Sequence, residues 1–276
     1  MLGGGGSAGH AWEVGVLAGL YDAGVDLTDA ELIVGTSAGA TVAAQICSTS
    51  PAELFAAVVA EVHPPPAGSS TAAHLDRTDR VIAAAADATD MRRRMGTTAL
   101  AMEAASDGAW GPRWRRTVAA RLTTEQWPER TLLITAVDAR TGDPVVFDRH
   151  GGVDLVDAVA ASTSASVVYP IDDDRYIDGG YRRNENADLA AGYERVVVLS
   201  PFGGRTRYPL EWGLQLATQV EELRAGGSVV ETVFPDDDAV AAFGTTMMDL
   251  SARPPAAHAG HRHGTALAEQ LTAFWL

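Results

Sequence analysis

Two glycine-rich turns lie within the first 39 residues, and the second of them strongly limits the folds open to this chain. It has the form Gly-x-Ser-x-Gly over residues 35–39 and follows the apolar run 32–34. Small, helix-forming residues come next, so the sequence predicts a buried strand, a sharp turn at Ser37 and a helix. Gly35 and Gly39 leave room for the neighbouring backbone, which is the pattern of a nucleophile elbow. The serine hydroxyl is then exposed at a helix start, where partial positive charge favours a developing anion.

The first turn, residues 3–9, has the sequence Gly-Gly-Gly-Gly-Ser-Ala-Gly. It leaves a row of backbone N–H groups uncovered by side chains, as an oxyanion hole requires. A glycine run alone is more often a flexible turn or a phosphate-binding loop, and Gly-x-Ser-x-Gly arises by chance in glycine-rich chains. The strand-turn-helix context of Ser37 favours the functional interpretation. Together the two turns predict a serine acyl hydrolase.

A third motif, Tyr-Ile-Asp-Gly-Gly at residues 176–180, offers a base for Ser37. It follows an acidic turn and stands where a short strand would end. A carboxylate on a tight turn without side chains can approach a hydroxyl closely and accept its proton without an imidazole. Taken alone, Asp178 followed by glycine is typical of a hairpin turn. Because the other two motifs precede it in this order, we interpret Asp178 as the general base.

The order of the three motifs, with about thirty residues between the first two, resembles the patatin-like phospholipase family. The resemblance covers roughly residues 2–201, apart from a divergent stretch from about 60 to 125. It implies an α/β fold of three α/β/α layers around a mainly parallel sheet. It also implies that the chain cleaves carboxylic esters of lipids through a Ser–Asp dyad.

Carried over position by position, the resemblance assigns Ser37 as the nucleophile and Asp178 as the general base. It assigns residues 4–9 as the oxyanion loop. The expected oxyanion donors are the N–H groups of Gly4, Gly5 and Gly6, and the glycines expected to shape the three turns are Gly9, Gly35, Gly39, Gly179 and Gly180. No cofactor and no metal is expected.

The glycine loop departs from the family pattern in its details. Ala8 stands where many family members carry Arg or Lys, so the loop lacks a cation. One residue more than usual separates Gly9 from the apolar run 15–17. The strand that feeds the loop is reduced to Met1 and Leu2, whereas about five residues are usual. We therefore expect the native strand to begin upstream of Met1.

Two other functions remain open on the sequence alone. His258, His261 and His263 follow Ser37 and Asp178 in the order of an α/β-hydrolase triad, although that fold usually places its serine after several strands. These histidines lie in a Pro/Gly/Ala-rich segment, which we predict to be a loop before a closing helix at 266–275, and metal sites usually need further ligands. The second alternative is a catalytically silent acyl-binding protein, which Ala8 leaves open.

The chain is predicted to be a single domain, residues 1–276, with a helical, cap-like insertion at about 76–122. Within the insertion one helical face gathers methionines and an alanine, namely Met91, Met95, Ala99 and Met102. Such a stripe is more often core than a surface for a flexible acyl chain. We nevertheless interpret the insertion as a cap over an acyl pocket, with core packing as the alternative.

Charge and composition limit the partners of the chain. A net charge of −15 over 276 residues disfavours nucleic acid and long-range attraction to anionic membranes. We expect a lipid or ester substrate and transient contact with a membrane surface. The single cysteine, Cys47, and the absence of a signal peptide or a long apolar run predict a cytoplasmic protein. Headgroup, acyl length, positional selectivity, transacylation and oligomeric state are not specified.

Overall fold

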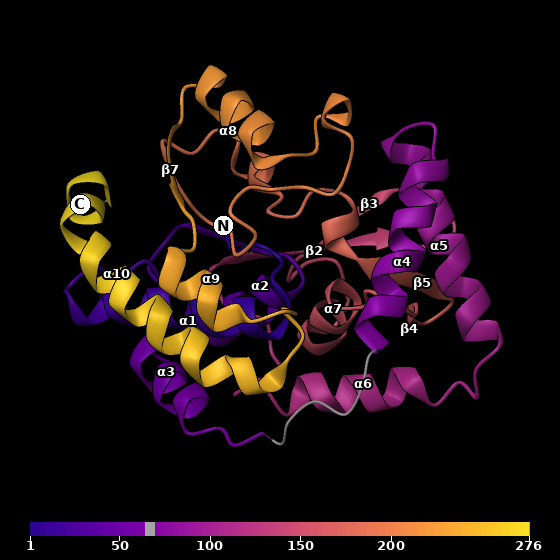
Figure 1. Cartoon of the computed structure of the whole chain (residues 1–276), viewed down its shortest axis with the longest axis horizontal. Coiled ribbons are helices and arrows are strands. Elements are labelled where there is room, and N and C mark those ends of the chain that lie inside the picture. Colours follow the sequence, from indigo (N-terminus) through magenta and orange to yellow (C-terminus); the bar gives the residue numbers. More distant parts are fainter. Residues whose placement is uncertain (64–69, 276) are drawn as a thin grey trace.

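The computed structural model describes residues 1–63 and 70–275. Its strands form a sheet that lies between helices, so the α/β fold expected from the sequence is confirmed (Figure 1). The strands of the central part are β1 (Leu32–Gly35), β2 (Thr131–Asp138), β3 (Pro144–Phe147), β4 (Tyr169–Ile171) and β5 (Asp174–Asp178). A parallel pair, β6 (Arg195–Leu199) and β7 (Val229–Val233), completes the set.

Parallel pairing joins β1 to β2 and β6 to β7. Leu2 connects these two pairs, because it forms parallel bridges to Gly35 on one side and to Leu199 on the other. Beyond β2 the pairing turns antiparallel, with β3 and β5 both beside β2 and β4 beside β5. The sheet is therefore mostly parallel across its centre and antiparallel at one side.

The alternation of side chains along the strands explains the three layers, since successive residues point to opposite faces. In β6, Val197 belongs to one buried cluster, whereas its neighbours Val196 and Val198 belong to another. The helices of the first cluster are α1 (Gly6–Asp22), α2 (Ala38–Ile46), α3 (Pro51–Val59), α6 (Trp110–Ala119), α7 (Leu155–Ser162), α9 (Asp237–Phe243) and α10 (Arg253–Trp275). The opposite face is covered by α4 (Ser70–Ala84), α5 (Ala88–Ala104) and α8 (Leu216–Ala225).

Glycines bring α1 and α10 unusually close together. A Cβ atom on Gly15 would lie 2.1 Å from the carbonyl oxygen of Ala257, and one on Gly260 would lie 2.3 Å from that of Trp12. Gly264 makes the same kind of approach to α1. Figure 1 shows α10, in yellow, running across the lower left of the view with α1 beside it. The small residues of this segment therefore serve helix packing.

The predicted loop before residue 266 is wrong, because α10 already begins at Arg253. Its two prolines, Pro254 and Pro255, occupy the first turn, where the missing N–H groups have no partner in the helix in any case. Glycines lower the stability of an isolated helix, and here the packing against α1 offsets that loss. Tertiary packing has overridden the local signal.

The insertion consists of α4, α5 and α6, and its methionine face packs into the molecule. Met91 is fully buried and Met95 nearly so, in a cluster with Val137 of β2 and Ile177 of β5. These methionines therefore belong to the core, which was the alternative interpretation of the stripe. None of the helices in the described ranges is long and apolar enough to cross a membrane.

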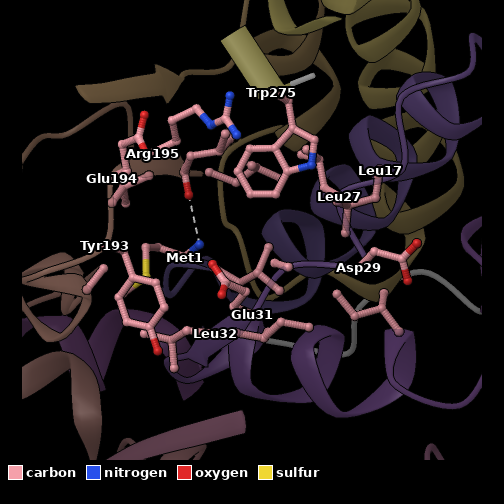
Figure 2. Close-up of a pocket in the computed structure, with 18 residues that line it drawn as sticks. Met1, Leu17, Leu27, Asp29, Glu31, Leu32, Tyr193, Glu194, Arg195 and Trp275 are labelled. Atoms are coloured by element: carbon pink, nitrogen blue, oxygen red, sulfur yellow. Dashed lines mark hydrogen bonds between the residues drawn. The ribbon is translucent and has the colours of Figure 1, made fainter. Parts of the chain in front are cut away.

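A cavity of about 300 Å³ lies at the amino-terminal edge of the parallel strands (Figure 2). Leu32 of β1 and Arg195 of β6 lie on opposite sides of it, with Tyr193 and Trp275 also in the lining. The cavity lies between these two strands, which Leu2 joins through its bridges to Gly35 and Leu199, and both Met1 and Leu2 contribute to its lining. Ser37 follows the carboxyl end of β1, so the predicted nucleophile and the cavity lie at opposite ends of this strand.

Candidate active site

The register of the sheet brings Ser37 and Asp178 together. Gly35 of β1 pairs with Ile134 of β2, and Ala136, two residues further along β2, pairs with Asp178 on its other side. Ser37, two residues after Gly35, is therefore level with Asp178 across the end of β2. The Ser37 hydroxyl donates a hydrogen bond to Oδ2 of Asp178, with 2.7 Å between the oxygens. Two residues 141 positions apart in the chain thus meet in one site.

The backbone of Ser37 has the strained conformation of a nucleophile elbow. Its φ of 53° and ψ of −118° are rare for a residue with a side chain, and such strain collects at functional sites. Immediately after it, α2 begins at Ala38. A Cβ on Gly39 would lie 2.2 Å from the Leu2 carbonyl oxygen, and one on Gly35 would lie 2.6 Å from the Ala40 Cα. Both glycines are therefore required by close backbone contacts.

Asp178 is 7 % exposed and lies at the end of β5. One carboxylate oxygen accepts from Ser37 and the other accepts from the Gly180 N–H at 2.8 Å. Burial raises the pKa of Asp178 to about 6, and the hydrogen bonds from Ser37 and Gly180 partly oppose this rise. Gly179 fits against β2, where a Cβ would lie 2.3 Å from Thr135 Oγ1. The carboxylate is thus fixed in place as the hydrogen-bond acceptor of the serine hydroxyl.

Two residues that fix the site were not singled out for it from the sequence. Ser162 Oγ, at the end of α7, accepts from the backbone N–H of Ser37 at 2.9 Å. The Asn186 side-chain amide donates to Thr36 Oγ1 at 3.0 Å, beside Ser37, and to the Gly179 carbonyl at 3.3 Å, beside Asp178. Asn186 is fully buried. It links the two turns that carry the dyad, but no local pattern indicates this role.

The glycine loop offers fewer free N–H groups than the sequence predicts. The Gly4 N–H donates to the carbonyl of Asn184 at 3.1 Å, which removes Gly4 from the expected oxyanion donors. Gly5 caps α1, and the first N–H groups of a helix have no partner within it. Among the described residues, no backbone bond engages the N–H groups of Gly5 and Gly6.

The remaining residues of the loop are set by close packing. Gly5 and Gly9 both lie against the Pro201 ring, which a Cβ would approach to 2.5 Å and 2.9 Å. Ala8 is fully buried in the core, so position 8 holds no cation. Its N–H donates to the carbonyl of Met247 at 2.9 Å. The loop is therefore held by residues from the carboxyl-terminal part of the chain.

The three late histidines contact helices α1 and α3. His261 pairs with Asp22 at 2.9 Å and stacks on Phe55, which also contacts the edge of His258. His263 lies beside Trp12. In the part of the chain that the structure describes, no hydrogen bond joins any of them to the dyad, and no cluster of His, Cys, Asp or Glu is placed to hold a metal ion. Their positions on α10 disfavour the triad interpretation.

Comparison with known proteins gives one match. The family model described as "Patatin-like phospholipase" matches residues 1–191, which is more than half of the chain. The matched region contains the glycine loop, the elbow and the Asp178 turn. The strands β6 and β7 and the helices α8 to α10 lie outside it. None of the curated proteins matches the chain.

Proposed function

The chain belongs to the patatin-like phospholipase family, and from that premise we propose that it hydrolyses carboxylic esters of lipids through a Ser37–Asp178 dyad. The observation that carries the proposal is the 2.7 Å hydrogen bond from the serine hydroxyl to the buried carboxylate. Nucleophilic catalysis requires a hydroxyl within reach of a base, and the base must itself be oriented. The Gly180 N–H provides that orientation.

In the acylation step, Asp178 accepts the proton of Ser37 Oγ as this oxygen attacks the ester carbonyl carbon. The C=O π electrons move to the carbonyl oxygen, which becomes an oxyanion. The N–H groups of Gly5 and Gly6 donate to this oxyanion, and the start of α1 adds its partial positive charge. When the intermediate collapses, the alcohol leaves with the proton from Asp178, and the acyl group remains on Ser37.

In the deacylation step, Asp178 accepts a proton from water as the water oxygen attacks the acyl carbonyl. The second oxyanion uses the same two donors. Its collapse releases the carboxylic acid and returns the proton from Asp178 to Ser37. A base with a pKa of about 6 suits both steps, because it is ionised at neutral pH and is more basic than an ordinary aspartate.

The substrate class in this proposal is a lipid or other carboxylic ester reached through transient contact with a lipid surface. Residues 1–276 act as one domain that includes the helices of the 76–122 segment. A cytoplasmic location fits the single cysteine, Cys47. None of the described side chains needs a metal or a cofactor for the steps above.

Covalent labelling tests the nucleophile. A fluorophosphonate should label the protein once, at Ser37, and Ser37→Ala should abolish both labelling and ester hydrolysis. Ser106→Ala, at an exposed serine on a surface turn, is the matched control and should change neither. Replacing His258, His261 and His263 together by Ala should also leave labelling intact. Labelling that survives in Ser37→Ala contradicts the proposed nucleophile, and its loss in the folded triple-histidine variant favours a triad.

A further inference from the structure

Two residues from the carboxyl-terminal part of the chain form hydrogen bonds with one peptide group of the oxyanion loop. One bonds to its carbonyl oxygen and the other to its N–H. The carbonyl oxygen of Ser7 accepts from the guanidinium Nη1 of Arg253 at 3.3 Å. The N–H of Ala8 donates to the carbonyl of Met247 at 2.9 Å. These two atoms belong to the same planar peptide unit, so contacts at both ends fix its orientation. Both partners lie outside the region matched by the family model.

Arg253 is itself held rigidly. Its Nε and Nη2 atoms form a bidentate ion pair with the Glu61 carboxylate, with N–O distances of 2.6 Å and 2.9 Å, and its side chain is 11 % exposed. Nη1 also donates to Nδ1 of His10, at 3.2 Å. That contact requires an unprotonated Nδ1, so the other ring nitrogen donates to Gln45 at 2.9 Å. Burial and the nearby Arg253 charge lower the pKa of His10 to about 3, which keeps the ring neutral.

One peptide unit separates the Ser7–Ala8 peptide group from that of the Gly6 N–H, the second of the two expected donors. Gly6 has a φ of 59°, in the left-handed region that favours glycine. A Cβ there would lie 2.8 Å from the Met247 carbonyl oxygen and 2.9 Å from the Met248 sulfur. Residues 247–248 therefore lie against the oxyanion loop without a side chain between them. The Met247 carbonyl accepts from Ala8, and within residues 1–63 and 70–275 no backbone carbonyl accepts from the N–H groups of Gly5 and Gly6.

We infer that Arg253 is a positioning residue, which together with the Met247 carbonyl sets the orientation of the oxyanion donors from outside the family-matched region. The inference rests on the proposed function, because it gives the loop its role in catalysis. The guanidinium does not touch the reacting atoms. It acts through the Ser7 carbonyl, and its charge is balanced by Glu61.

The first test measures the loop directly and does not depend on catalysis. In Arg253→Ala, amide hydrogen exchange in the segment that includes Ala8 should be at least about tenfold faster than in the wild type, because the hydrogen bond from Arg253 to the Ser7 carbonyl is lost. Arg262→Ala is the matched control, since Arg262 lies on the same helix and forms an exposed ion pair with Asp238. It should leave exchange in the loop unchanged. Equal exchange in both variants would overturn the inference.

The second test measures catalysis on the same proteins. Misplaced donors should lower kcat and the rate of fluorophosphonate labelling at least about tenfold in Arg253→Ala, with little change in KM. Arg253→Lys keeps a positive charge beside Glu61 but lacks the planar guanidinium group, so it should lose less kcat than Arg253→Ala does. This second variant keeps the test valid if Arg253→Ala does not fold.

The outcomes separate the inference from the proposed function. If the wild type neither reacts with the fluorophosphonate nor hydrolyses esters, the proposed function is contradicted. The exchange measurement still tests whether Arg253 orders the loop. If the wild type is active and the Arg253 variants keep both kcat and the protection of the loop amides, only the inference about Arg253 is contradicted. Loss of both in the Arg253 variants, with Arg262→Ala unchanged, supports it. These measurements are made well below the unfolding temperatures of the variants.

Discussion

Burial of the Asp178 carboxylate has a direct effect on the pH dependence of the reaction. In the proposed mechanism Asp178 must be ionised before it can accept the Ser37 proton, and burial raises its pKa to about 6 because it disfavours the charge. We expect the rate of hydrolysis of an uncharged ester to rise with pH and to level off above an apparent pKa of about 6. The measurement is a pH profile of kcat/KM, checked against the range over which the fold is stable. A profile that is flat from pH 5 to 8 would argue against Asp178 as the base.

The same burial costs stability at neutral pH. Because the pKa of Asp178 rises from 3.8 in a free chain to about 6 in the folded protein, the folded state binds more protons than the unfolded state between these values. This contribution to the free energy of unfolding therefore falls as pH rises through that window, by up to about 3 kcal/mol. Asp178→Asn removes the cost, so it should stabilise the protein more at pH 8 than at pH 4. Denaturant unfolding at both pH values measures the difference, and an equal effect at both would contradict the assignment.

At the scale of elements, the glycine contacts between α1 and α10 predict a reversal of the usual helix preference. Alanine normally stabilises a helix interior by up to about 1 kcal/mol relative to glycine. In Gly260→Ala the new methyl would lie 2.3 Å from the Trp12 carbonyl oxygen, so overpacking should lower the free energy of unfolding by about 1–3 kcal/mol. Gly151→Ala is the control, since its Cβ would meet nothing closer than 3.8 Å. Thermal unfolding of both variants is the measurement, and a rise in Tm for Gly260→Ala would refute the close packing.

The elements that could be predicted from sequence are those whose signals are local. The strand, turn and helix around Ser37 lie within residues 32–46, and the turn after Asp178 lies within residues 178–181. The residue types of both turns are dictated by backbone geometry. Asn186, by contrast, ties Thr36 to Gly179 across 150 residues, and only the folded sheet brings them together. The start of α10 was missed for a similar reason. Its prolines and glycines are poor helix formers alone, and the benefit of packing on α1 is invisible in the segment itself.

At the scale of the whole molecule, the net charge of −15 should govern how the protein meets a lipid surface. Part of its positive charge is already paired internally, for example Arg94 with Asp90 and Arg115 with Asp157. An anionic surface should therefore repel the protein at low ionic strength, and added salt should screen this repulsion. We expect hydrolysis on anionic vesicles to rise with salt, while hydrolysis of a soluble short-chain ester changes little. A fall with salt on anionic vesicles would reveal a basic contact surface instead.

The packing of α1 on α10 also bears on how the chain is made. Ribosomes synthesise α1 well before α10, yet the Gly15 contact with Ala257 joins the two helices across more than 200 residues. Until α10 emerges, the surface of α1 that packs against it has no cover, and contacts between such distant segments form slowly because a long loop must close. Until residues 247–253 are synthesised, the glycine loop of a nascent chain also lacks its hydrogen bonds to Met247 and Arg253. A chain that stalls before α10 would therefore expose apolar surface of α1 and lack the contacts that fix its glycine loop, so it should be prone to aggregate and inactive in the proposed reaction.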